Sequence, residues 1–73
     1  MNSEIHLRKI LTQIDIKLGM FHPMFQALTL PAYVMIEKGK YEKAKQYIKD
    51  LCKELQNYKE IYKHVEEYCK KVM

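Results

Sequence analysis

An unbroken helical spacing of apolar side chains through residues 41–72 most constrains what this chain can fold into. Ten side chains, apolar or tyrosine, recur at alternating intervals of three and four residues: Tyr41, Ala44, Ile48, Leu51, Leu55, Tyr58, Tyr62, Val65, Cys69 and Val72. This interval places them on one stripe of an α-helix, as in a heptad repeat. All glycines and prolines precede residue 40, so neither residue type interrupts a helix here. The pattern predicts a long C-terminal helix over residues 40–72.

Two forms of this helix fit the sequence. A single helix would be about 50 Å long at 1.5 Å per residue. The alternative is a break near Gln56 and Asn57, where a turn would fit. We favour the continuous helix, because the apolar stripe keeps its phase across these two residues. Tyrosine, alanine and cysteine make the stripe irregular in volume and partly polar. Such a stripe suits a mixed helical bundle or a protein interface better than a two-stranded coiled coil.

An N-terminal helix is predicted from Glu4 to about Leu18. Asn2 or Ser3 would cap its start, and Glu4 would lie at the positive end of the helix dipole. Gly19 suits the left-handed residue that often ends a helix. The main apolar stripe has spacings of four, three and four residues: Leu7, Leu11, Ile14 and Leu18. Further isoleucines lie beside this stripe and off it, so we expect the helix to contact two neighbours.

Residues 18–36 carry no formal charge, and their number matches a membrane span. Polar side chains, Pro23 and Pro31 interrupt the segment, and lysines flank it on both sides, so we do not expect membrane insertion. A short helix is predicted to start at Pro23, and Pro31 either kinks it or opens the next helix. The apolar run 32–36 has no partner strand, so it is predicted as a buried helix ending at Gly39. We expect this segment to face the core of a small bundle.

The chain carries a net charge of +4, and twelve of its thirteen basic side chains are lysines, Arg8 being the exception. Arginine dominates base reading and bidentate phosphate binding, so a solvated lysine surface is favoured over a nucleic-acid site. Four lysines lie roughly on one side of the C-terminal helix and would carry any nucleic-acid contact: Lys38, Lys45, Lys49 and Lys53. Contact through lysines of this kind would not depend on sequence.

Cys52 and Cys69 form no CxxC or other metal-binding spacing. In one helix they would lie about 25 Å apart, and a turn near Asn57 would place them at different levels. We therefore expect two free thiols and no disulfide. With no signal-peptide pattern at Met1, we also expect a cytoplasmic location. The histidines are isolated and complete no metal-ligand or acid–base pattern: His6, His22 and His64. The sequence thus predicts no catalytic, metal or cofactor site, and no enzyme.

The segment from Gly39 to Ala44, preceded by Ala32 and followed by Ile48 and Leu51, resembles the turn and second helix of a tetratricopeptide-type hairpin. It is also similar to the hairpin of three-helix domains that bind the tails of membrane-remodelling proteins. In such hairpins the glycine frees the turn and the alanine permits close helix contact. The resemblance covers one repeat only. It implies an antiparallel hairpin over residues 31–55, with peptide binding as the associated function.

We predict one all-α domain over residues 1–73, a bundle of three to four helices. The hairpin reaches only to about Gln56, so the stripe beyond it needs other cover. A partner chain supplies that cover most economically, either a second copy or a larger protein. The predicted partner-binding residues are Leu55, Tyr58, Tyr62, Val65, Cys69 and Val72. The leading function is a non-enzymatic protein–protein interaction module, that is an adaptor, chaperone-like subunit or inhibitor. The alternative is a small basic nucleic-acid-associated regulator.

Overall fold

A computed structural model describes the backbone of residues 2–73 and the side chains of residues 4–73. Four α-helices and one 3-10 helix follow one another: α1 (Asn2–Phe21), η1 (Pro23–Thr29), α2 (Leu30–Glu37), α3 (Tyr41–Leu55) and α4 (Lys59–Cys69). No strand occurs in this part of the chain. The predicted all-α small bundle is therefore confirmed.

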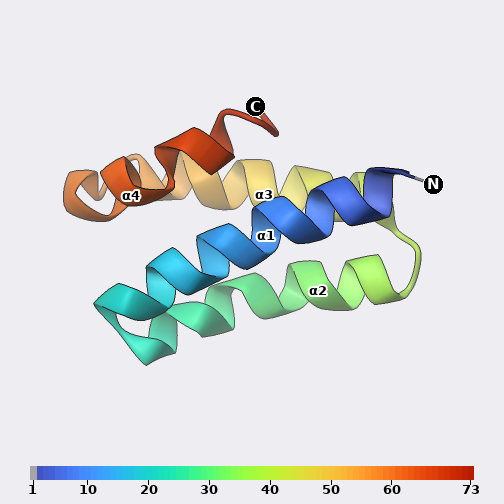
Figure 1. The fold of residues 1–73 in the computed structure, drawn as a ribbon, viewed down its shortest axis with the longest axis horizontal. Helices are drawn as coiled ribbons and strands as arrows, with labels where there is room; N and C mark the ends of the chain where they lie inside the picture. Colours follow the sequence, from blue (N-terminus) through green and yellow to red (C-terminus); the bar gives the residue numbers. More distant parts are fainter. Residues whose placement is uncertain (1) are drawn as a thin grey trace.

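Helix α1 is the central element of the bundle. It contacts each of the other elements, while α2 packs on α3 and α3 packs on α4. Figure 1 shows α1 lying between α2 on one side and the α3–α4 pair on the other. Its stripe supplies five buried residues to the core: Leu7, Ile10, Leu11, Ile14 and Leu18. The predicted first helix thus contacts more than the two neighbours expected of it.

The end of α1 lies beyond the predicted stop. Gly19 is helical, and the helix continues to Phe21, where the His22 amide donates to the Leu18 carbonyl oxygen at 3.2 Å. Pro23 disfavours helical backbone at His22, so the helix ends there and not at the glycine. The predicted capping by Asn2 or Ser3 falls outside the described side chains.

The two prolines each open a helix. Pro23 starts η1, and the Nδ1 atom of His22 caps it by accepting the Met24 amide at 3.1 Å. Pro31 is the second residue of α2, which decides between its two predicted roles. Gly39 has a φ of +74°, in the left-handed region that glycine adopts without steric cost. The predicted helix end at Gly39 is confirmed, and α2 and α3 form an antiparallel hairpin across it (Figure 1). The tetratricopeptide resemblance itself stays a prediction.

The C-terminal half is broken into two helices, so the favoured continuous helix is wrong. Helix α3 ends at Leu55 and α4 begins at Lys59. In the turn between them, the Asn57 amide donates to the Glu54 carbonyl oxygen at 3.1 Å and the Tyr58 amide to that of Leu55 at 2.9 Å. The turn lets the two helices fold against each other and direct both halves of the stripe into one core. Seven stripe residues are buried there: Ala44, Ile48, Leu51, Leu55, Val65, Cys69 and Val72.

None of the described helices is both long and apolar enough to cross a membrane. The uncharged segment 18–36, which has the length of a span, is divided among α1, η1 and α2.

Candidate interaction surfaces

The predicted partner-binding stripe lies mostly inside the chain. Four of the six residues are buried by the protein itself: Leu55, Val65, Cys69 and Val72. Tyr62 is half-buried, and only Tyr58 is largely exposed, at 55%. The physical reason is that α1 packs on α4 as well as on α3, so the cover that was expected from a partner chain comes from the N-terminal helix. These four residues are core residues, and the assumption that they need a partner chain for cover is wrong.

The two cysteines are joined by a disulfide, so the prediction of two free thiols is wrong. The Cα atoms of Cys52 and Cys69 lie 5.9 Å apart, and both side chains are fully buried. The prediction assumed that α4 runs back strictly parallel to the axis of α3. Figure 1 instead shows α4 inclined to α3, with the turn between them at the outer end. The inclination brings the last residue of α4 level with a residue one turn from the end of α3. The cytoplasmic prediction rested in part on unpaired cysteines, and that support is lost.

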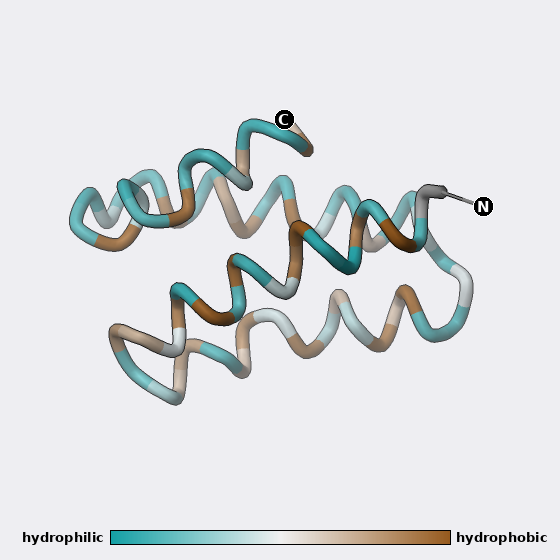
Figure 2. Tube along the Cα trace, viewed as in Figure 1, coloured by the Kyte–Doolittle hydropathy of each residue, from teal (hydrophilic) through white to brown (hydrophobic). Residues whose placement is uncertain are grey.

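Large apolar side chains are exposed along η1 and its flanks, where a core-facing segment was predicted. They are Met20, Phe21, Met24, Leu28, Leu30 and Val34. Within 20–36, only Thr29, Ala32 and Ile36 are buried. In Figure 2, η1 and α2 are drawn largely in white to brown, whereas α3 and α4 alternate with teal. The prediction that residues 18–36 face the core is therefore wrong for at least half of their large side chains. The physical reason is that a short helix can bury only one of its sides.

An apolar cavity of about 310 Å³ lies where η1 meets the junction of α3 and α4. One carboxylate, Glu54, stands among six apolar or aromatic lining residues: Phe25, Leu28, Leu51, Leu55, Tyr58 and Ile61. The Tyr47 hydroxyl donates to the Leu28 carbonyl oxygen at 2.6 Å and so fastens η1 to α3. Burial raises the pKa of Tyr47 above its usual value, which keeps this hydroxyl a donor. Sequence reasoning missed Phe25, Leu28 and Ile61. The available signal was that residues 20–34 hold more large apolar side chains than one helix face can bury.

Three of the four predicted nucleic-acid-binding lysines lie on one side of α3, and the fourth lies outside that helix. Lys38 lies in the turn before α3, while Lys45, Lys49 and Lys53 follow one another along α3 at intervals of four residues. Lys49 is half-buried and the other three are exposed. Lys45 borders a small cavity of about 110 Å³ together with residues of α1 and of the chain end.

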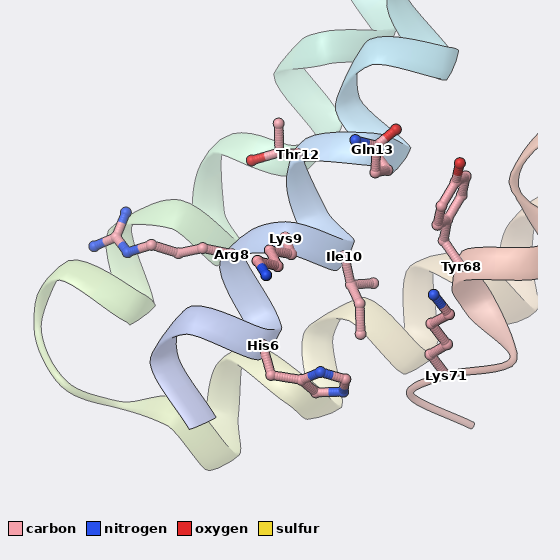
Figure 3. Close-up of a pocket in the computed structure, with 8 residues that line it drawn as sticks. All are labelled: His6, Arg8, Lys9, Ile10, Thr12, Gln13, Tyr68 and Lys71. Carbon is pink, nitrogen blue, oxygen red and sulfur yellow. The ribbon is translucent and has the colours of Figure 1, made fainter. Parts of the chain in front are cut away.

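A larger groove of about 650 Å³ runs between α1 and the end of α4. Eight residues line it: His6, Arg8, Lys9, Ile10, Thr12, Gln13, Tyr68 and Lys71. Figure 3 shows His6, Ile10 and Gln13 on the side of α1 that faces Tyr68 and Lys71, whereas Arg8 points away from them.

Arg8 is engaged by two carboxylates on the other side of α1. Its Nε donates to Glu4 at 2.9 Å and its Nη2 donates to Glu37 of α2 at 2.6 Å. The Tyr41 hydroxyl of α3 donates to the second oxygen of Glu4 at 2.9 Å. Hydrogen bonds from Arg8 and then Tyr41 lower the pKa of Glu4 below its usual value. This polar cluster joins α1, α2 and α3, and it leaves the only arginine unavailable to the groove.

No group of three or more His, Cys, Asp or Glu side chains that could hold a metal ion occurs in the described part of the chain. Comparisons with protein-family models, with curated proteins and with solved structures find no match to this chain.

Proposed function

We propose that this protein is a non-enzymatic protein–protein interaction module that docks through the apolar cavity at the η1–α3–α4 junction. One observation carries the proposal: exposed large apolar side chains are concentrated in the uncharged segment that borders this cavity. Single exposed apolar residues are ordinary on protein surfaces, but a run of them around an apolar depression is typical of an interface. An adaptor, a chaperone-like subunit and an inhibitor would each use such a surface.

The occupant that we propose is a second copy of this chain. The chain carries a net charge of +4, so most approaches of two copies bring lysines together. Residues 18–36 contain no charged side chain, and contact through η1 avoids that repulsion. In a dimer with two-fold symmetry, Leu28 and Tyr58 of each copy would contact the same surface of the other copy. Two-fold symmetry is the commonest symmetry of small oligomers.

Sedimentation equilibrium of the full chain at micromolar concentration tests this proposal. The parent should show a mass above 8.8 kDa, the mass of one chain. The variant Leu28→Glu should sediment as a monomer with unchanged helicity by circular dichroism, because a carboxylate in the apolar contact would be desolvated. Ile5→Glu is the control, since Ile5 is an exposed apolar residue on α1 that lies outside the cavity, at 57% exposure against 39% for Leu28.

Three outcomes are informative. A monomeric parent would exclude a second copy as the occupant. If the parent, but not Leu28→Glu, then retained another protein, the proposed interaction surface would stand with a different partner. Equal assembly of the parent and both variants would place the interface elsewhere. Loss of assembly in both variants would show a general effect of charge and would contradict the assignment of the cavity.

A further inference from the structure

Two cavities lie along the contact between α1 and α4. The first, of about 650 Å³, ends at Gln13 of α1 and Tyr68 of α4. A second cavity of about 230 Å³ is lined by Lys17, Met20, Phe21 and His64. Lys17 follows Gln13 by one helical turn, and His64 precedes Tyr68 by one turn. Because α1 and α4 pack on each other, the two cavities lie one helical turn apart along the same contact, and we call them together the α1–α4 groove.

The α1–α4 groove is lined by cations and by no carboxylate of the described residues. Lys9, Lys17 and Lys71 contribute ammonium groups from both sides. The ion pairs in the described part of the chain occupy Arg8, Lys63 and Lys70, and none involves these three lysines. The groove therefore presents uncompensated positive charge, which attracts an anionic ligand.

Aromatic rings stand between these lysines. Tyr68 is half-buried, and the Lys71 Nζ lies 5.8 Å from the centroid of its ring. One turn further along, the rings of Phe21 and His64 pack edge to face with centroids 5.1 Å apart. Figure 3 shows the Tyr68 ring rising beside Gln13 with the Lys71 ammonium beneath it. Partly exposed rings that stand among lysines are the pattern that binds unpaired bases and their phosphates together.

We propose that the α1–α4 groove binds single-stranded nucleic acid. The ammonium groups of Lys9, Lys17 and Lys71 contact backbone phosphates, and the rings of Tyr68 and Phe21 stack with bases. A single strand fits better than a duplex, because bases in a duplex are already stacked and cannot reach a ring in a groove. Binding is independent of base sequence, since Arg8, the only guanidinium in the chain, is held by Glu4 and Glu37.

This site differs from the lysine row predicted on α3. Of that row, only Lys45 approaches the groove, through the small cavity that it borders with His6 and Lys71. The two proposals are tested at different residues, because Leu28 and Tyr58 lie outside the α1–α4 groove, whereas Met20 and Phe21 belong both to the groove and to the exposed apolar residues near η1.

Fluorescence anisotropy with a labelled oligothymidine tests the proposal on the full chain. The double variant Lys9→Glu with Lys71→Glu should weaken binding at least about tenfold and reduce the dependence of log K on log salt by about 1.4, the slope of two phosphate contacts to a single strand. Lys38→Glu with Lys53→Glu makes the same change of charge outside the groove, and it should have a much smaller effect. Tyr68→Leu keeps an apolar contact with the core but removes the stacking face, and it should weaken binding by about tenfold.

Equal losses in the two double variants would overturn the site and leave only diffuse lysine charge. Binding of a polyglutamate peptide as tightly as the oligothymidine would assign the groove to acidic protein segments instead. Displacement of the oligothymidine by millimolar inorganic phosphate, with no effect of Tyr68→Leu, would reduce the site to a simple anion site. Circular dichroism of each variant establishes that a lost affinity is not a lost fold.

Discussion

Helices α2 and α4 differ in how far they bury their valine side chains. Helix α2 is apolar on every side, yet only Ala32 and Ile36 are buried, and Val34 remains 50% exposed. Helix α4 is mostly polar, yet Val65 is fully buried. The difference teaches that the arrangement of apolar residues, and not their number, sets burial. A narrow stripe at helical spacing can meet one core completely, whereas a helix that is apolar all round must leave part of itself outside a bundle this small.

The largest expected effect comes from placing the same charge at the two valines. Val65→Asp should lower the free energy of unfolding by about 4 kcal/mol or more, because it loses apolar burial and places an unpaired carboxylate in the core. Val34→Asp should cost about 1 kcal/mol or less, mainly through helix propensity. Urea denaturation followed by circular dichroism gives both values.

If Val65→Asp does not fold, Val65→Ala keeps the comparison measurable. It should cost about 2 kcal/mol, against less than about 0.5 kcal/mol for Val34→Ala. Equal costs at the two positions would contradict the difference in burial between α2 and α4.

A second comparison concerns the disulfide, which joins α4 to α3, whereas α2 contains no cysteine. Reduction of the Cys52–Cys69 disulfide should lower the free energy of unfolding by about 3 kcal/mol, the loss expected for a closed loop of this length. Backbone amides of α4 should then exchange with solvent faster, and those of α2 should change less. Urea denaturation with and without dithiothreitol, together with hydrogen exchange, measures both effects.

The double variant Cys52→Ala with Cys69→Ala is the control, since its stability should not respond to dithiothreitol. Titration of two free thiols per unfolded chain in the absence of reductant would exclude the disulfide.

The smallest expected effect is the pH dependence of the polar cluster, which joins α2 to α1 and α3 and includes no residue of α4. The pKa of Glu4 is lower in the folded chain than its usual value of 4.5, because Arg8 and Tyr41 donate to its carboxylate. Its contribution is therefore complete above that usual value and is lost as the pH falls through the folded pKa. The parent should melt above Glu4→Gln at neutral pH, and the two melting curves should converge in acid. A difference that persists unchanged at low pH would show that the charge of Glu4 is not its source.

The sequence predicted the core of the C-terminal half well. Residues such as Ile48 and Val65 are buried as the apolar stripe indicates, because helical spacing reports which side of a helix turns inward. The turn at residues 56–58 corresponds to the alternative break near Gln56 and Asn57, which the sequence could not decide for, because a three-residue turn leaves the spacing of the stripe unchanged. The sequence could not report the disulfide either, because pairing depends on how α4 is inclined to α3.

The interaction surfaces were harder to predict than the core. The apolar cavity combines Phe25 of η1 with Leu51 of α3 and Ile61 of α4, and the α1–α4 groove combines Lys9 with Lys71. Each set comes from segments far apart in the chain, so no local spacing connects its members. The stripe residues were predicted to bind a partner because the spacing of apolar residues contains no information on how α1 divides its contacts among the other helices.

The central position of α1 also sets an order of events during synthesis. Helix α1 leaves the ribosome before the rest of the domain, yet α4, which packs on it, leaves after η1, α2 and α3. The part of α1 that α4 covers therefore stays exposed to solvent until translation of the domain is almost complete. A chaperone that binds nascent chains would have the longest time to bind the apolar stripe of α1, which includes Leu11 and Ile14. The docking of α4 on α1 is thus the last step in the folding of this domain during synthesis.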